Sequence, residues 1–317
     1  MNSSFKPVIL GLSGPKVSKK EYFLFKKHLP LGYILFTRNI ENFSQLKNLI
    51  TQLRSINPNK KTFIMIDHEG GRVNRFLNFF NQFDYSAKIF GEHFKSNKKI
   101  FKKKMRKFIN FNSNLFNYLG IDLVAAPVLD LFHKNKSAVI GDRAYSSNVR
   151  EVQSIAKIVI SEYGKKGIYT IGKHVPGHGL SDQDSHFILP IIKESKQFLM
   201  NNDFACFKDI NPHFFMTAHI VYEKFDKNNP ATFSSIIIND LIKKDFKYKG
   251  IVMSDDICMK ALRGSVEERA RKSLQAGCDI VLHCNGNFKE MTKLLSVVKP
   301  ANDLLLAKMI KIFNYHL

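Results

Sequence analysis

Histidine and carboxylate side chains crowd into one short stretch of the sequence, Lys173–His186, which reads KHVPGHGLSDQDSH. A strand does not tolerate proline and glycine at this density, so the stretch should leave the sheet as a polar loop. The apolar residues 167–172 immediately before it predict a buried strand. Loops held by a rigid strand commonly carry catalytic groups. The stretch is therefore the first candidate for acid–base chemistry.

Other ionisable side chains occupy a comparable position, at the carboxyl end of an apolar run. These strand-end residues are Asp67, Lys173, His174, His219, Asp255, Asp256 and His283. The carboxyl ends of the strands in a parallel barrel meet on one face, and catalytic groups lie on that face. Charges placed at random would fall at both ends of the runs. The pattern predicts one active site assembled from five strands, although it assigns no catalytic role to His219 or His283.

The apolar runs also predict the fold class. They are continuous rather than alternating, which indicates strands that are covered on both faces, as in a parallel sheet. The expected strands are residues 8–12, 33–36, 63–66, 121–126, 168–171, 214–218, 251–253 and 280–282. Eight strands mostly separated by helical stretches predict an α/β fold, a single (β/α)8 TIM barrel over residues 1–317. An open doubly wound sheet is the alternative, but no G-x-G-x-x-G follows the first strand.

Composition excludes several classes of protein. Hydrophobic residues make up 44% of the chain, which is enough for a large core and argues against disorder. No apolar stretch approaches the roughly 20 residues of a membrane helix, and the N-terminal apolar run lacks the preceding basic region of a signal peptide. We therefore expect a cytoplasmic monomer without membrane contact. The cysteines form no C-x-x-C pair, which favours reduced thiols over disulfides or a zinc site; they are Cys206, Cys258, Cys278 and Cys284.

The formal net charge of +22 raises the question of an anionic partner. Its densest stretch is Lys95–Lys107, with eight basic residues, and a nucleic-acid-binding barrel is the alternative function that such a patch suggests. Lysines are spread over the whole chain, however, which favours a solvated helix face. We expect no nucleic-acid partner, and a positive field that attracts anionic substrates.

Carboxylates, histidines and basic groups around one mouth suit two reaction classes. Glycoside hydrolysis uses a carboxylate nucleophile and a separate acid/base, whereas metal-assisted hydrolysis uses His and Asp as ligands. The first strand ends in GLSG at residues 11–14, without the H-x-H pair of many barrel metallohydrolases, and H-E-x-x-H is absent. We therefore expect no catalytic metal and no other cofactor.

Four longer motifs occur in order along the chain: DHEGGRVNRF at residues 67–76, KHVPGHGLSDQDSH at 173–186, MTAH at 216–219 and VMSDD at 252–256. Together with APVLD at 126–130 and AVIGDR at 138–143, they resemble glycoside hydrolase family 3, in its bacterial β-N-acetylglucosaminidase branch. The resemblance implies a single-domain barrel, without a C-terminal sandwich domain, that removes terminal β-linked N-acetylglucosamine with retention of configuration. It also implies a cytoplasmic sugar or muropeptide substrate, namely anhydro-muropeptides in cell-wall recycling.

The resemblance also assigns roles to individual residues. Asp255, the first Asp of the Ser-Asp-Asp motif, matches the nucleophile. His186 matches the acid/base, and Asp184 matches the carboxylate partnered with it. The residues that match the sugar-binding set are Asp67, Arg75, Arg143, Lys173 and His174.

Elementary chemistry is consistent with these roles. A retaining mechanism needs a carboxylate that is ionised at neutral pH, which Asp255 can supply. His186 can act as acid and base because the pKa of an unperturbed imidazole lies near neutrality, and Asp184 can orient it. Glycines 177 and 179 predict that the loop closes over bound sugar. A phosphorylase stays open as the second enzymatic reading, because a histidine repels phosphate less than a carboxylate does.

Overall fold

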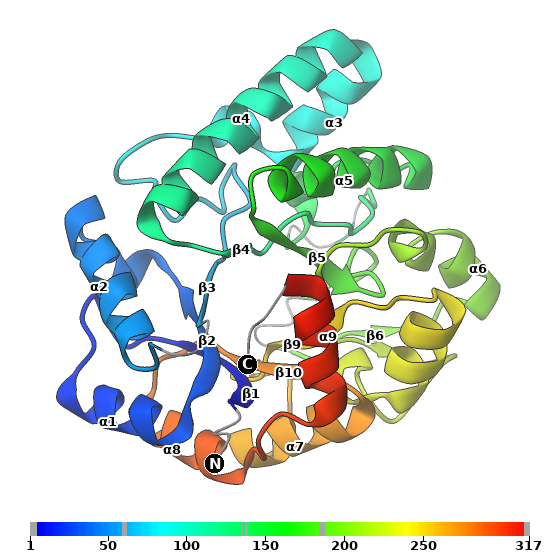
Figure 1. Cartoon of the computed structure of the whole chain (residues 1–317). Coiled ribbons are helices and arrows are strands. Elements are labelled where there is room, and N and C mark those ends of the chain that lie inside the picture. The colour runs from blue at the N-terminus through cyan, green and yellow to red at the C-terminus, as the bar shows by residue number, and fades with distance from the viewer. Residues whose placement is uncertain (1–4, 59–61, 135, 137–138, 184–187, 314–317) are drawn as a thin grey trace.

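The computed structural model describes residues 5–58, 62–134, 136, 139–183 and 188–313. Eight parallel strands in these residues close into a barrel in the order β1-β10-β9-β7-β5-β4-β3-β2 (Figure 1). The barrel strands are β1 (Lys6–Gly11), β2 (Pro30–Leu35), β3 (Phe63–Ile66), β4 (Leu123–Val124), β5 (Tyr169–Val175), β7 (Phe214–Thr217), β9 (Ile251–Asp256) and β10 (Ile280–His283). The predicted (β/α)8 barrel is confirmed. The short strands β6 (Ile191–Ile192) and β8 (Val221–Tyr222) form a separate parallel pair.

Helices surround the barrel, as Figure 1 shows. They are α1 (Lys19–His28), α2 (Phe43–Ser55), α3 (Ala87–Ser96), α4 (Lys98–Leu119), α5 (Val149–Gly164), α6 (Lys196–Asn201), α7 (Val266–Ala276), α8 (Phe288–Val297) and α9 (Asp303–Phe313), with a π-helix at Ile236–Asp245. Polar side chains set the starts of several helices. Asn42 accepts a hydrogen bond from the Gln45 amide before α2, and Asn148 accepts one from Glu151 before α5. No helix among the described residues is both long enough and apolar enough to span a bilayer.

Strand β4 is shorter, and β5 longer, than the expected residues 121–126 and 168–171. The pairing of β4 stops at Val124, and Pro127, which has no amide hydrogen to donate, follows it. β5 runs on to Val175 because β7 pairs with it as far as Val175, which lies opposite Thr217. On its other side the Leu129 amide donates to the Lys173 carbonyl at 2.7 Å. Lys173 therefore lies on the strand and not in the loop that follows. This placement holds its side chain inside the barrel mouth.

The C-terminal helix α9 closes one end of the barrel. The ring of Phe313 packs against Phe63, Tyr169 and Phe214, with centroids 5.1, 4.5 and 5.5 Å away. Those three residues begin strands β3, β5 and β7, so α9 covers the N-terminal end, where Figure 1 shows it lying across the barrel. The opposite end, where the strand-end residues gather, is left for ligands.

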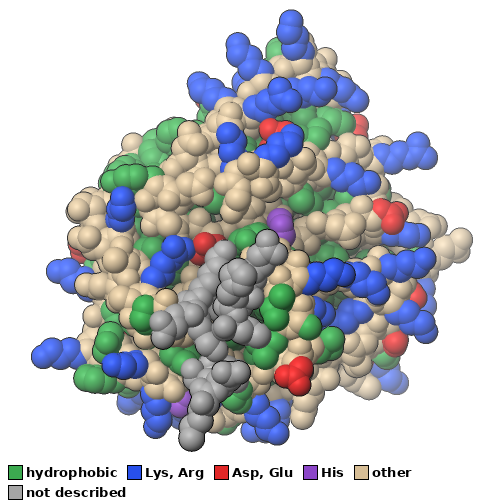
Figure 2. Space-filling view, viewed as in Figure 1, with side chains coloured by type: hydrophobic (Ala, Val, Ile, Leu, Met, Phe, Trp, Pro, Cys, Tyr) green, Lys and Arg blue, Asp and Glu red, His purple; other side chains and the backbone are tan. Residues whose placement is uncertain are grey.

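The basic stretch at residues 95–107 falls at the end of α3 and along α4. The helix α4 buries Phe101, Met105 and Phe108 and exposes its lysines, including Lys98 and Lys102. Figure 2 shows lysine and arginine side chains spread widely over one face of the molecule, with a group over α3 and α4. The stretch is thus an amphipathic helix with a charged outer surface, as the sequence indicated.

Candidate active site

A pocket of about 380 Å³ opens at the C-terminal end of the barrel strands. Its volume falls in the range of small-molecule sites. The structure brings six of the predicted site residues into its lining, namely Asp67, Arg75, Arg143, Lys173, His174 and Asp255. Asp184 and His186 lie outside the described residues. The predicted convergence of strand-end side chains on one mouth is therefore seen for Asp67, Lys173, His174, Asp255 and Asp256, whereas His219 and His283 are absent from the lining.

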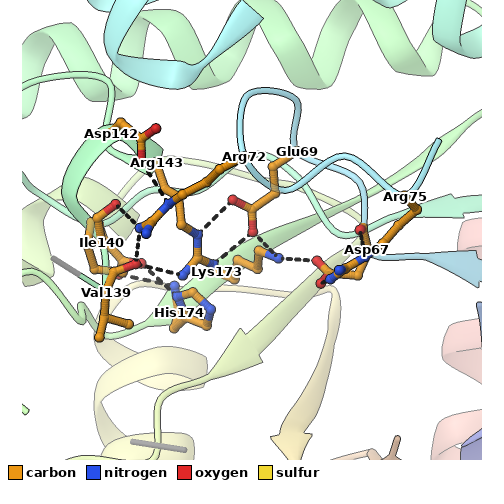
Figure 3. A network of polar contacts seen from close by, with 11 residues as sticks. Asp67, Glu69, Arg72, Arg75, Val139, Ile140, Asp142, Arg143, Lys173 and His174 are labelled. Carbon is orange, nitrogen blue, oxygen red and sulfur yellow. Dashed lines mark hydrogen bonds and ion pairs between the residues drawn. The ribbon is translucent and has the colours of Figure 1, made fainter. Parts of the chain in front are cut away.

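Five charged side chains at one wall of the pocket form a connected network (Figure 3). We call Asp67, Glu69, Arg75, Arg143 and Lys173 the ion-pair network. The Nζ of Lys173 donates to Asp67 Oδ1 at 2.8 Å and contacts Glu69 Oε1 at 2.6 Å. Arg143 donates a hydrogen bond to each carboxylate oxygen of Glu69, both at 2.8 Å, and Arg75 forms an ion pair with the Asp67 carboxylate. Bidentate and shared contacts of this kind hold each side chain in one geometry.

Local chain geometry brings Arg75 to Asp67. Gly70 and Gly71 have φ angles of +88° and +57°, which side chains other than glycine adopt only with strain. A Cβ atom at position 70 would also lie 2.6 Å from the Tyr85 carbonyl oxygen. The chain therefore reverses after Glu69. Arg75 lies in the turns that follow, and its Nε donates to the Asp67 carbonyl oxygen at 2.7 Å.

Electrostatics keeps the network ionised despite its burial. Burial raises the pKa of Asp67, but the positive charges of Lys173 and Arg75 lower it by more than burial raises it. The pKa therefore lies well below its usual range. Burial likewise opposes ionisation of Glu69, and Arg143 and Lys173 still bring its pKa to about 2. Lys173 is only 3% exposed, yet the two carboxylates raise its pKa above the ordinary value. The pocket wall thus carries fixed donors and acceptors that are charged at neutral pH.

The low pKa of Glu69 predicts a loss of stability in acid. The pKa is about 2 in the folded chain against an ordinary value of 4.5, so the unfolded chain binds a proton more readily. The stabilisation is complete above the ordinary value and is lost as the pH falls towards about 2. The urea concentration at the midpoint of unfolding should fall between about pH 6 and about pH 2.5, and we expect this fall to be smaller in Glu69→Gln than in the unaltered chain. Replacement of the exposed Glu92 by Gln is the control, and an unchanged slope in Glu69→Gln would contradict the assignment.

A buried carboxylate that the sequence reading did not include organises the start of the 173–186 loop. Asp130 is fully buried, and its two oxygens bind His174 Nδ1 at 2.7 Å and the His174 and His178 amides at 3.1 and 2.7 Å. Burial and the neighbouring His174 lower the pKa of His178 to about 4, so His178 is neutral near pH 7. Asp130 therefore fixes both the backbone turn and the orientation of the His174 ring.

Asp255 faces the pocket from the end of β9. Burial raises the pKa of this carboxyl, but His219, His174 and the Asp256 amide lower it below the ordinary value overall. The amide of Asp256 donates to Asp255 Oδ1 at 2.7 Å. His219 Nε2 donates to the Asp256 carbonyl oxygen at 2.9 Å, which ties the end of β9 to the strand-end residue after β7. The arrangement presents an ionised, oriented carboxylate, as a nucleophile requires.

Sequence reasoning missed Glu69 and Asp130 as members of the site. Both follow an apolar run by a few residues, so the strand-end rule that selected Asp67 also applied to them. Glu69 lies two residues after Asp67 in the DHEGGR motif, and Asp130 ends the APVLD motif.

Comparison with known proteins agrees with this geometry. The glycosyl hydrolase family 3 N-terminal domain matches residues 9–311. A beta-hexosaminidase of Thioalkalivibrio sulfidiphilus is 35% identical over 286 residues, which are 89% of this chain and 81% of that protein. A beta-hexosaminidase of Haemophilus influenzae is 34% identical over 284 residues, 88% of this chain and 79% of that protein.

A solved structure is similar over almost the whole barrel. Native NagZ from Neisseria gonorrhoeae has a TM-score of 0.87 at 32% identity, covering 96% of this chain and 89% of that one. The same protein in complex with N-trifluoroacetyl-D-glucosamine gives a TM-score of 0.87 at 31% identity, covering 98% and 90%. The family motifs read from the sequence, the closed barrel and these relatives agree. The chain belongs to glycosyl hydrolase family 3 and is a glycoside hydrolase.

Proposed function

We propose that the chain is a retaining exo-β-N-acetylglucosaminidase that hydrolyses terminal β-linked N-acetylglucosamine. The observation that carries the proposal is the pocket itself, in which an ionised Asp255 faces a wall of fixed hydroxyl-binding groups. The choice of sugar is supported by the relatives named beta-hexosaminidase and by the N-acylated glucosamine bound in the Neisseria gonorrhoeae protein. The cellular substrate that we propose is an anhydro-muropeptide of cell-wall recycling, cleaved in the cytoplasm.

The proposed reaction has two displacements. The Asp255 carboxylate forms a bond to the anomeric carbon while the bond to the leaving oxygen breaks, and His186 donates a proton to that oxygen. Water then attacks the same carbon, gives its proton to His186 and releases Asp255. Asp184 holds His186 in one tautomer and stabilises its charged form, as the carboxylate does in a Ser-His-Asp triad.

The ion-pair network supplies the sugar-binding contacts in this proposal. Asp67 accepts hydrogen bonds from sugar hydroxyls, while Arg75, Arg143 and Lys173 donate to hydroxyl or acetamide oxygens. Because these side chains already hold one another in place, little conformational entropy is lost when the sugar binds. Deletion of one partner leaves another buried and unsatisfied, at a cost of about 1–3 kcal/mol.

Residues 1–317 act as one catalytic domain in this proposal, as a monomer with neither nucleic-acid nor membrane partners. Turnover needs no metal and no organic cofactor, because the acid, the base and the nucleophile are all side chains. Treatment with a chelator should therefore leave hydrolysis intact.

The proposal is tested with two aryl glycosides that differ only at carbon 2 of the sugar. Aryl β-N-acetylglucosaminide should be cleaved with a higher kcat/KM than aryl β-glucoside, because the arginines of the pocket can bind the acetamide oxygen. The sugar product should be free N-acetylglucosamine both with and without phosphate in the buffer. A preference for the glucoside would refute the substrate, and a sugar phosphate as the main product would make the enzyme a phosphorylase.

The role of His186 predicts a dependence on the leaving group. We expect His186→Ala to slow the hydrolysis of a disaccharide by about 10²-fold or more, and that of an activated aryl glycoside far less. An activated aryl oxide leaves without a proton, whereas a sugar alkoxide does not. The control is His133→Ala, which removes a histidine that pairs with Asp203 and is absent from the pocket lining. Equal losses on both substrates would show that His186 is not the general acid.

A further inference from the structure

Three metal-ligating side chains meet beside the pocket, outside its lining. The ligand atoms of Cys258, His283 and Glu290 all lie within 4.8 Å of one another. His283 Nε2 and Glu290 Oε2 form a hydrogen bond at 3.3 Å. We call these three residues the Cys–His–Glu cluster. Neither the proposed hydrolysis nor the ion-pair network uses any of them.

The barrel topology gathers residues that are far apart in sequence. Cys258 follows β9, His283 ends the adjacent strand β10, and Glu290 lies in the first turn of α8. β9 and β10 pair in parallel, with Leu282 opposite Asp256, so the two strands end side by side. The spacing between the three residues has no zinc-finger pattern. This is why the sequence favoured reduced thiols without a zinc site.

Hydrogen bonds around the cluster fix the backbone and one ligand. Asp256 Oδ1 accepts the amides of Cys258 and Cys284, at 2.9 and 3.0 Å, and so joins the loops after β9 and β10. Asn285 Nδ2 donates to Glu290 Oε2 at 2.7 Å. Outer groups of this kind orient metal ligands and raise affinity for the ion. Hydrogen bonds therefore hold in place the backbone that carries Cys258 and His283, as well as the Glu290 carboxylate.

The state of each side chain suits a dication. The His283 ring is fully buried, and its Nδ1 has no hydrogen-bond partner within the described part of the chain. Cys258 is a free, half-buried thiol, and a bound cation can displace its proton. A bound dication would then be balanced by one thiolate and one carboxylate.

We propose that Cys258, His283 and Glu290 bind one zinc ion, with water as the fourth ligand. A thiolate, an imidazole and a carboxylate together favour zinc over magnesium or calcium, which prefer oxygen ligands alone. Two ligand atoms about 2.1 Å from a tetrahedral ion lie about 3.4 Å apart, close to the separation of the His283 and Glu290 atoms. Glu290 is 40% exposed and Cys258 is half-buried, so water has access to the remaining position.

Zinc at this position ties together three elements at the rim of the pocket. Met259, Cys284 and Asn285 line the pocket and directly follow or adjoin cluster residues in the chain. A shared ion would hold the loops after β9 and β10 and the start of α8 in one arrangement. Because the ion binds the folded chain and not the unfolded one, it should raise the melting temperature.

The test is cobalt and zinc binding to the full chain, purified without a histidine tag and stripped with a chelator. Cobalt should bind in one equivalent and give the near-ultraviolet charge-transfer band of a cobalt–thiolate bond, and zinc should abolish that band by displacement. In Cys258→Ala the band should vanish and zinc affinity should fall by at least about tenfold. Glu290→Gln, at a partly exposed position that tolerates substitution, should keep the band and weaken binding.

Two matched controls place the ion at this cluster. Cys206→Ala removes a buried thiol elsewhere, and Glu267→Gln removes a carboxylate of α7 that pairs with Lys293 of α8. Both should bind metal as the unaltered chain does. A cobalt–thiolate band that persists in Cys258→Ala, or its absence from the unaltered chain, would overturn the proposal. If Cys258→Ala fails to fold, unchanged zinc affinity in Glu290→Gln would overturn it as well. Hydrolysis of the aryl glycoside is a separate readout, so failure here leaves the proposed function untouched.

Discussion

Replacement of Asp255 by Asn should lower kcat on aryl β-N-acetylglucosaminide by at least about 10³-fold, because the amide cannot form the glycosyl ester. The chain should stay folded, since the Asn oxygen can still accept the hydrogen bond that the Asp256 amide donates to Asp255 at 2.7 Å. The loss should appear in kcat more than in KM, because the side chain reacts instead of merely binding. Steady-state kinetics together with circular dichroism measures both parts.

A smaller side chain at the same position gives an independent check. In Asp255→Ala a small anion such as azide can enter the space and attack the anomeric carbon, which should restore part of the rate on activated substrates. The control is Asp279→Asn, which removes a carboxylate paired with Lys308 near the closed end of the barrel. That variant should lose stability and keep its kcat. Appreciable turnover by Asp255→Asn would show that another group is the nucleophile.

The second large effect concerns stability. Lys173→Met should lower the free energy of unfolding by about 3–5 kcal/mol, because it leaves two buried carboxylates without their shared cation. The lysine is 3% exposed and contacts both Asp67 and Glu69 within 2.8 Å. Methionine has a similar length and shape, so the loss reports charge and not volume. Urea unfolding at neutral pH measures it.

Two further variants separate the charge effect from a general lysine effect. Lys102→Met, on the exposed surface of α4, should change stability by less than about 0.5 kcal/mol. Adding Asp67→Asn to Lys173→Met should recover part of the loss, because it removes a buried carboxylate that has lost one of its two cationic partners, and the double-mutant cycle gives the coupling. A loss below about 1 kcal/mol in Lys173→Met would contradict the picture of a buried, ionised network.

The barrel could be predicted from the sequence because strands that are buried on both faces consist of apolar residues throughout. Runs such as residues 63–66 and 280–282 are apolar throughout, since helices cover one side and the barrel interior the other. The position of Lys173 was harder to predict. Whether it starts a loop or ends a strand depends on its pairing with Met216 of β7 and on the hydrogen bond from Leu129, and no residue near Lys173 in the sequence indicates these partners. Pairing between distant segments decided the outcome.

The predicted site was incomplete for the same reason. Asp67, Lys173 and Asp255 each follow an apolar run and could be found one at a time. That Lys173 is shared between two acids, or that Asp130 fixes the His174 ring, depends on which strands are neighbours. The sequence does not show that the ligand atoms of Cys258 and His283 lie within 4.8 Å of each other, because 25 positions separate the two residues. The roles of Asp184 and His186 remain predictions from the motif.

The pairing of β1 with β10 has a consequence for how the molecule is made. In the closed barrel β1 pairs with β10, and Val8 lies opposite Val281. One edge of β1 therefore has no partner until β10 has been made. During synthesis, which proceeds from the N-terminus, the curved sheet stays open with an unsatisfied edge on β1 for most of the time the chain is growing. Ring closure therefore cannot precede the synthesis of β10, and Phe313, which follows β10 in the chain, can pack at the base only later. Until residues 280–283 have been made, the nascent chain lacks the strand that pairs with this edge of β1.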